Sequence, residues 1–297
     1  MTHSPKILIR FDWAIKSLLR DKANFDILEG FLCALLEDDS IEIIELLGEE
    51  GQQEDESEKF NRVDILVKDN QDRRIIIEVQ TTRESDYLER LLFGTSKAII
   101  ENIGLGNAYS NIHKVISVSI LFFNLGRGDD YLYHGTTSFT GMNDGKPLVV
   151  KRKEEKIING EQVIQFNDKN IFPEYYLIRV EKYKNIVTRK IDEWIYMIKN
   201  NEVKTGSTAK NINKAEEKLN FLNMSETERK RYERFLVNLH REKDMLDTAE
   251  EKGIQKGIKK GEYQKAIVTA TQMKKDKMPT KLIIKYTGLS EEEINKI

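Results

Sequence analysis

Residues 62–80, RVDILVKDNQDRRIIIEVQ, carry the strongest fold signal in the chain. Two dense runs of apolar and β-branched residues flank a polar segment at residues 70–72. Such runs on either side of a short polar turn are typical of a β-hairpin. Each run also holds a carboxylate, Asp64 in the first and Glu78 in the second, at a position where a core residue would be expected.

An antiparallel pairing centred on Gln71 gives the predicted hairpin one wholly apolar face, which suits a core. The other face then carries Asp64 opposite Glu78, with Gln80 two residues further along. Opposed side chains have Cβ atoms about 5 Å apart, so two carboxylates there repel unless a cation lies between them or one is protonated. A shift of two residues keeps the faces but separates the carboxylates diagonally.

Two interpretations of this polar face remain open from spacing alone. Two carboxylates and an amide carbonyl are hard oxygen ligands that suit Mg²⁺ or Mn²⁺. A solvated hairpin whose charged residues happen to align gives the same pattern. The four histidines lie far apart and show no metal-ligand spacing.

Length and composition restrict the class of protein. The 297 residues are 39% hydrophobic and 33% charged, enough for a core with a strongly solvated surface. The net charge of −2 argues against a uniformly basic nucleic-acid binder, so such binding would need a local basic patch. Cys33 is the only cysteine and is expected to be a small buried hydrophobe. With no apolar run near 18 residues and no signal peptide pattern, a cytoplasmic protein is expected.

Hydrophobic periodicity predicts a mixed α/β region followed by helices. Helices are expected over residues 11–37, 87–103 and 186–199. Strands are expected over residues 41–47, 63–68, 73–80, 115–124, 131–139, 147–151, 162–166 and 175–181. The pattern breaks near residue 200, which predicts an α/β domain over residues 1–200, a helical region over 201–247, and a glycine-repeat helix with a small helical element over 248–297.

The helical tail contains two notable features. Gly253, Gly257 and Gly261 are four residues apart, so they lie along one helix face. Each costs roughly 1 kcal/mol relative to Ala, which favours a homo-oligomer in which another helix approaches closely; a loosely ordered linker is the alternative. Residues 278–297 suggest helix, turn, helix, and could contact DNA or pack as a cap. Acidic residues 291–293 favour the cap, because phosphates would repel them.

The order of motifs resembles the PD-(D/E)XK nuclease family transposases, also described as recombination-promoting nucleases. The matching segments are FDWAIK at residues 11–16, Asp64 followed after thirteen residues by Glu78-Val79-Gln80, the strand at 118–123, and TGLSEEEI at 287–294. The resemblance implies a PD-(D/E)XK restriction-endonuclease-like core over residues 1–200, with a mixed central sheet flanked by helices and an all-helical C-terminal tail.

The resemblance also implies roles for particular residues. Asp64 and Glu78 would hold Mg²⁺ or Mn²⁺, with Glu29 favoured as the additional acid from the first helices. Gln80 stands where the family motif has Lys. Because an amide does not titrate, Gln80 could orient a water but not act as its base. Asp12 lies in the family signature and could pair with a lysine one turn later.

Because Gln80 carries no charge, another cation could stabilise the phosphate in place of the family's lysine. Lys16, Arg83 and Arg90 are the candidates for contacts to DNA phosphates. The function implied is a metal-dependent DNA endonuclease, transposase-like, that hydrolyses phosphodiester bonds in recombination. The alternatives are a non-catalytic DNA-binding or assembly protein that keeps the fold, and a nuclease acting on RNA or invading DNA.

Overall fold

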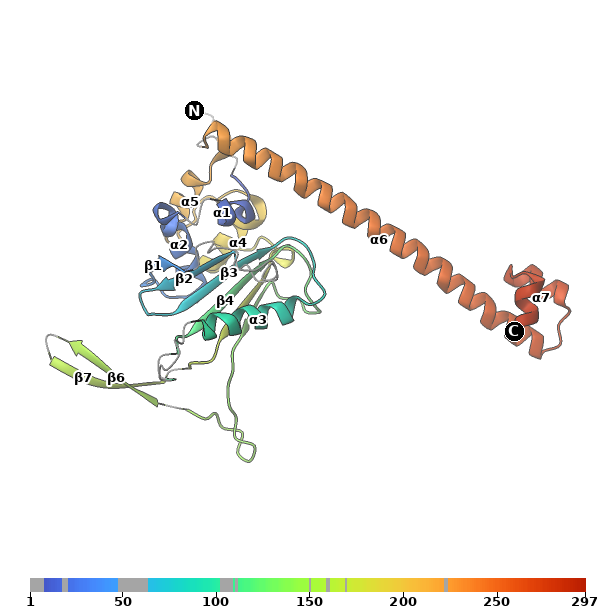
Figure 1. Cartoon of the computed structure of the whole chain (residues 1–297), viewed down its shortest axis with the longest axis horizontal. Coiled ribbons are helices and arrows are strands. Elements are labelled where there is room, and N and C mark those ends of the chain that lie inside the picture. The colour runs from blue at the N-terminus through green and yellow to red at the C-terminus, as the bar shows by residue number, and fades with distance from the viewer. Residues whose placement is uncertain are drawn as a thin grey trace. The chain divides into compact units, whose positions relative to one another are not determined.

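The computed structural model divides into two compact units, Met1–Ser225 and Glu226–Ile297, which are described separately (Figure 1). The backbone of β6, β7 and residues 16–17 is described without their side chains. The described residues are 8–17, 21–47, 64–101, 109, 112–149, 151–158, 161–168, 170–221 and 224–297.

The first unit is built on a six-stranded mixed sheet of order β1-β2-β3-β4-β8-β5. The three strands β3, β4 and β8 run parallel, and the other neighbours are antiparallel. The strands of this sheet are β1 (Ile43–Leu46), β2 (Ile65–Asp69), β3 (Arg74–Gln80), β4 (Val115–Leu121), β5 (Leu132–Gly135) and β8 (Glu174–Arg179). A separate antiparallel ribbon is formed by β6 (Lys151–Ile158) and β7 (Glu161–Asp168).

Helices cover both faces of the sheet, with α1, α2 and α4 on one face and α3 on the other (Figure 1). Phe31 packs against Phe11 at 6.0 Å and against Trp194 at 6.1 Å between ring centroids, which joins α1, α2 and α4 into one core. The helices and 3-10 turns of this unit are α1 (Phe11–Ser17), η1 (Lys22–Asn24), α2 (Phe25–Leu36), α3 (Tyr87–Ile100), η4 (Val180–Lys182), α4 (Lys190–Asn200) and α5 (Ile212–Lys218).

The β2–β3 hairpin has the predicted register, with Ile65 opposite Ile77 and Val67 opposite Ile75. All four of these side chains are buried. The opposite face is not solvated, because Ile76 packs against residues of α3 and β4. The polar residues at the end of that face therefore lie beside α3.

Several sequence-based element boundaries differ from the structure, and two of the differences have a local cause. The single helix predicted over residues 11–37 is α1, then η1, then α2. The Asp21 carboxylate accepts the Ala23 N–H at 3.0 Å and so starts η1, a local capping bond that competes with a continuous helix. The strand predicted over residues 147–151 falls before β6, because Pro147 forms only an isolated bridge with Thr140.

The first unit extends beyond the domain boundary predicted near residue 200. The Ile9 N–H donates to the Leu219 carbonyl at 2.8 Å. The buried Glu193 carboxylate accepts the N–H groups of Thr208 and Ala209, both at 2.7 Å. These bonds hold the irregular segment after α4 against the core, so the unit ends at Ser225.

Gly30 lies where α2 meets α4 and the segment before α5. A Cβ atom at this position would overlap the Lys210 carbonyl oxygen and lie 2.8 Å from Trp194 Cζ2. We expect Gly30→Ala to lower the free energy of unfolding by about 2–3 kcal/mol in urea titrations, because overpacking displaces buried neighbours. Gly94→Ala in α3 is the matched control, since nothing lies within 4 Å of its Cβ position. Equal stability of the two variants would contradict this packing.

The second unit consists of the 50-residue helix α6 (Glu226–Lys275) followed by α7 (Thr280–Thr287) and α8 (Glu291–Lys296). A small core of Ala270, Ile283, Leu289 and Ile294 joins the three helices, so residues 278–297 pack as a cap on the end of α6. Within the described residues, no helix is both long and apolar enough to cross a membrane.

Candidate metal and nucleic-acid site

The two hairpin carboxylates lie at the edge of the sheet where β3 ends. Asp64 immediately precedes β2, and its Oδ2 accepts the Val79 N–H at 2.7 Å. This bond holds the Asp64 carboxylate beside the backbone of Glu78 and Val79. The Glu78 side chain is 13% exposed, so its carboxylate is largely withdrawn from water.

Gln80 is the last residue of β3, and its amide has a fixed orientation. Its Nε2 donates to Glu84 Oε1 at 2.7 Å, and its Oε1 accepts from Arg90 Nη2 at 3.1 Å. A carboxylate only accepts and a guanidinium only donates, so these two neighbours determine which end of the amide is oxygen. The amide oxygen is therefore turned toward a positive charge.

Arg90 comes from the first turns of α3 and joins the polar residues into one network. Its Nη2 lies 3.9 Å from Glu78 Oε2, and its Nε lies 3.2 Å from Glu84 Oε2. Its guanidinium carbon is 5.3 Å from the centroid of the Tyr87 ring, one turn earlier in the helix. Burial raises the pKa of the Tyr87 hydroxyl, so this ring remains neutral beside the charges.

The structure does not bring Glu29 to Asp64 and Glu78. Glu29 Oε1 accepts the Ile43 N–H at 2.9 Å, and Ile43 pairs with Asp69 at the far end of β2. Five residues of strand separate Asp64 from Asp69, which is about 16 Å at roughly 3.3 Å per residue. Helix α2 thus places this acid at the wrong end of the strand for a shared metal.

The predicted pairing of Asp12 with the lysine one turn later involves a side chain that lies outside the described residues. The buried Asp12 carboxylate pairs with Arg10 at 3.0 Å. The side chain of Lys16 lies outside the described residues. Arg83 is exposed between β3 and α3, and it forms no ion pair within the described part of the chain.

Sequence reasoning missed Glu84, which completes the network around Gln80. No periodic pattern singles it out, because it lies in the irregular segment between β3 and α3. That segment turns so that Glu84 faces back toward the strand end, and the Gln80 amide also lies 3.2 Å from the Thr82 carbonyl oxygen.

The donor set fits a cation that is only partly coordinated by protein. Among the residues that the structure describes, no group of three or more His, Cys, Asp or Glu side chains could hold a metal. Mg²⁺ usually keeps several waters and takes one or two carboxylates together with substrate phosphates. Asp64 and Glu78 match that chemistry, whereas they do not form a closed structural site.

A mixed sheet flanked by helices, with an aspartate before one hairpin strand and Glu-x-Gln ending the next, defines a nuclease-like α/β protein. The sequence model of the PD-(D/E)XK nuclease family transposases matches residues 9–251, so the chain belongs to this family. This confirms the family resemblance and the fold class. Searches of curated proteins and of solved structures found no match.

Proposed function

We propose that this chain is a metal-dependent DNA endonuclease that hydrolyses phosphodiester bonds in recombination. The observation that carries the proposal is the 2.7 Å bond from the Val79 N–H to Asp64, which holds that carboxylate beside Glu78 and Gln80. Membership of a nuclease transposase family implies DNA as the substrate.

Asp64 and Glu78 would hold Mg²⁺ or Mn²⁺. When bound, such an ion lowers the pKa of the attacking water and offsets negative charge on the phosphate. The Gln80 carbonyl has two lone pairs, and Arg90 uses one of them, so the second is left to accept a hydrogen bond from that water. Gln80 orients the water without taking its proton, because an amide does not titrate.

Arg90 supplies the positive charge that Gln80 lacks. Its Nη2 lies 3.1 Å from the Gln80 oxygen, so the cation sits next to the position where a Lys side chain would end. Glu78 and Glu84 hold it there before substrate arrives. A guanidinium that is already fixed in position stabilises charge that develops on a phosphate without further reorganisation.

Incubation of the purified protein with supercoiled plasmid tests the proposed activity. Nicking is expected in Mg²⁺ and Mn²⁺ and none in EDTA. If the protein binds plasmid but cuts it in neither metal, the non-catalytic DNA-binding or assembly function replaces the nuclease. Gln80 at the lysine position is the observation that favours this second function.

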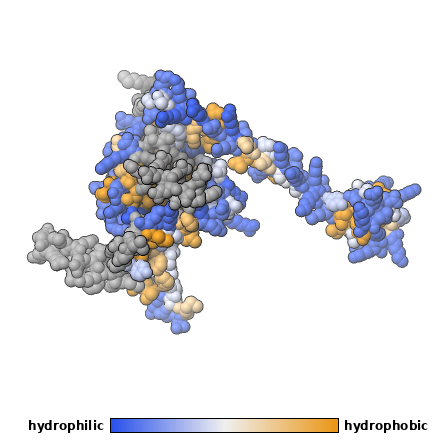
Figure 2. All heavy atoms as spheres, viewed as in Figure 1, coloured by the Kyte–Doolittle hydropathy of each residue, from blue (hydrophilic) through white to orange (hydrophobic). Residues whose placement is uncertain are grey.

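We also propose that α6 mediates homo-oligomerisation. Residues 240–265 are exposed throughout, and nothing lies within 4 Å of a Cβ built on Gly253, Gly257 or Gly261. Ile254 and Ile258, each 55% exposed, lie beside the glycines. The surface of α6 is mostly hydrophilic and carries apolar patches along its length (Figure 2). Because helices in proteins are stabilised mainly by packing of one face, a second copy is the expected cover.

Ile254→Glu/Ile258→Glu is expected to reduce the molar mass in light scattering to that of one chain, because it places four charges in a two-chain interface. The matched control is Met245→Glu/Thr248→Glu, which adds the same number of charges at exposed positions on a different face of α6, at about 100° per residue. A wild-type protein that already has the mass of one chain would refute the proposal.

A further inference from the structure

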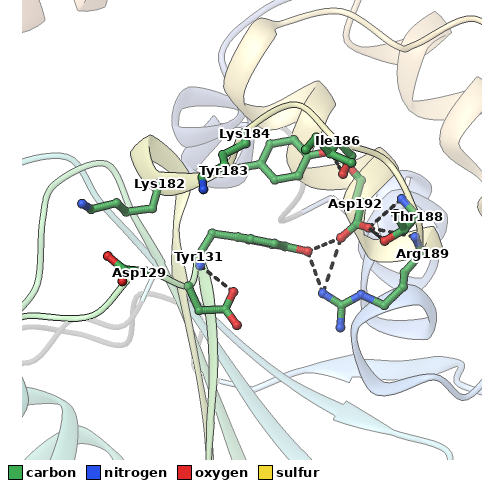
Figure 3. A pocket seen from close by; sticks show the side chains of 10 residues that line it. Asp129, Tyr131, Lys182, Tyr183, Lys184, Ile186, Thr188, Arg189 and Asp192 are labelled. Atoms are coloured by element: carbon green, nitrogen blue, oxygen red, sulfur yellow. Dashed lines mark hydrogen bonds and ion pairs between the residues drawn. The ribbon is translucent and has the colours of Figure 1, made fainter.

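A hollow of about 530 Å³ lies beside η4 and the start of β5 (Figure 3). Two aromatic rings, Tyr131 and Tyr183, meet edge to face in its wall with centroids 5.0 Å apart. Three cationic side chains, Lys182, Lys184 and Arg189, line it as well. The hollow therefore combines aromatic surface with three positive charges, and Asp129, Asp130 and Asp192 line it as well.

The hollow lies at the same edge of the sheet as the candidate metal site. Gln80 pairs with Leu121, and Leu121 pairs with Arg179, so these three strand ends form one row. The hollow's residues from η4 and beyond directly follow Arg179. Two strand spacings separate Gln80 from Arg179, about 10 Å. Ligands of open α/β sheets bind outside the carboxyl ends of parallel strands, which is this edge.

The wall of the hollow is rigid because a buried carboxylate organises it. Asp192, 2% exposed, accepts hydrogen bonds from the Tyr131 hydroxyl, from Thr188 Oγ1 at 2.8 Å and from the Arg189 N–H at 2.8 Å. Burial acts to raise the pKa of Asp192, but these hydrogen bonds outweigh it and lower the pKa, so the group stays ionised. Arg189 Nη2 also donates to the Tyr131 hydroxyl at 2.7 Å.

Two lysine side chains in the wall of the hollow are available to an anion. Asp192 is occupied by its hydrogen bonds and pairs with Arg189 at 3.5 Å. Asp130 accepts the Tyr131 N–H at 2.7 Å, a bond from a neutral donor that does not cancel the charge of a carboxylate. Asp129 is an exposed carboxylate on the rim. Lys182 and Lys184 form no ion pair within the described residues, so their two ammonium groups remain available beside the carboxylates of Asp129 and Asp130.

We propose that this hollow binds a nucleotide of the DNA strand that runs past the candidate metal site, with Lys182 and Lys184 on a phosphate and Tyr131 against the sugar or base. The identity of the strand as DNA rests on the proposed function.

Binding of a labelled DNA duplex in EDTA, measured by fluorescence anisotropy over a range of salt concentrations, tests the proposal. Lys182→Ala/Lys184→Ala should weaken binding about 10-fold and reduce the salt slope by about 1–2, since each lost phosphate contact removes about 0.9. The matched control is Lys190→Ala/Lys214→Ala, two exposed lysines paired with Asp39 and Asp26, which should stay within about twofold of the wild type.

Equal Kd and salt slope in the two double variants would overturn the proposal, as would a wild type that binds no DNA. Thermal unfolding in the presence of dTMP tests whether the hollow binds a free nucleotide instead of a DNA strand. If dTMP raises the Tm of the wild type but not of Lys182→Ala/Lys184→Ala, while both bind duplex equally, the hollow is a free-nucleotide site instead. The binding assay is run in EDTA, so its result does not depend on cleavage of the DNA. A wild type that never cuts plasmid, but whose affinity depends on Lys182 and Lys184, refutes the nuclease and supports the hollow.

Discussion

Glu78→Gln is expected to lower the rate of plasmid nicking in Mg²⁺ by more than about 100-fold. Changing groups that merely support a metal ligand already costs about 10- to 100-fold, so loss of a ligand should cost more. The change keeps the volume of the side chain and removes the charge that lies 3.9 Å from Arg90. Asp64→Asn should behave in the same way, because an Asn oxygen can still accept the Val79 N–H.

Glu29→Gln is the matched control for these variants. It removes the same charge, and its remaining oxygen can still accept the Ile43 N–H. Because the structure places Glu29 at the far end of β2, nicking should stay within about twofold of the wild type. A loss as large as that of Glu78→Gln would contradict this placement. Titration with Mn²⁺ gives a second readout, in which Asp64→Asn and Glu78→Gln, but not Glu29→Gln, should lose the metal-induced rise in Tm.

The hairpin was predictable because its alternation allows few registers. Ile65, Val67, Ile75 and Ile77 must all face the core, and a slip of one residue would turn them toward the other face. That constraint places Asp64 near Glu78 without any information from the rest of the chain. The structure adds that α3 covers the second face, which no pattern within the hairpin reveals.

The partners of Gln80 were not predictable from the sequence, because they depend on the path of residues 81–86. Glu84 reaches Gln80 only through the turn that leads into α3, and Arg90 reaches it only because α3 packs on that face. The location of Glu29 was not predictable for the related reason that helical spacing fixes which residues share a face, but not where along a strand the helix docks. The boundary predicted near residue 200 does not take into account the hydrogen bonds by which Glu193 holds an irregular segment.

Arg90→Ala is expected to lower nicking by about 100-fold, the cost of removing a preorganised electrostatic contact in many active sites. The loss follows from position, since Arg90 is the cation within 3.1 Å of the Gln80 oxygen and its carboxylate neighbours hold it in place. Arg83→Ala is the matched control, because Arg83 is exposed and forms no ion pair within the described residues. It should reduce nicking by no more than about threefold.

Placing a lysine at position 80 tests whether Arg90 acts through its positive charge or only through its structural contacts. Arg90→Ala/Gln80→Lys is expected to recover at least about tenfold of the activity lost by Arg90→Ala, because the ammonium group would occupy the place the guanidinium leaves. Gln80→Lys alone should not raise activity, since two cations would then compete for Glu78 and Glu84. If the double variant unfolds at the same temperature as Arg90→Ala but recovers no nicking, Arg90 only holds the loop in place. The charge that substitutes for lysine must then come from elsewhere at this edge of the sheet.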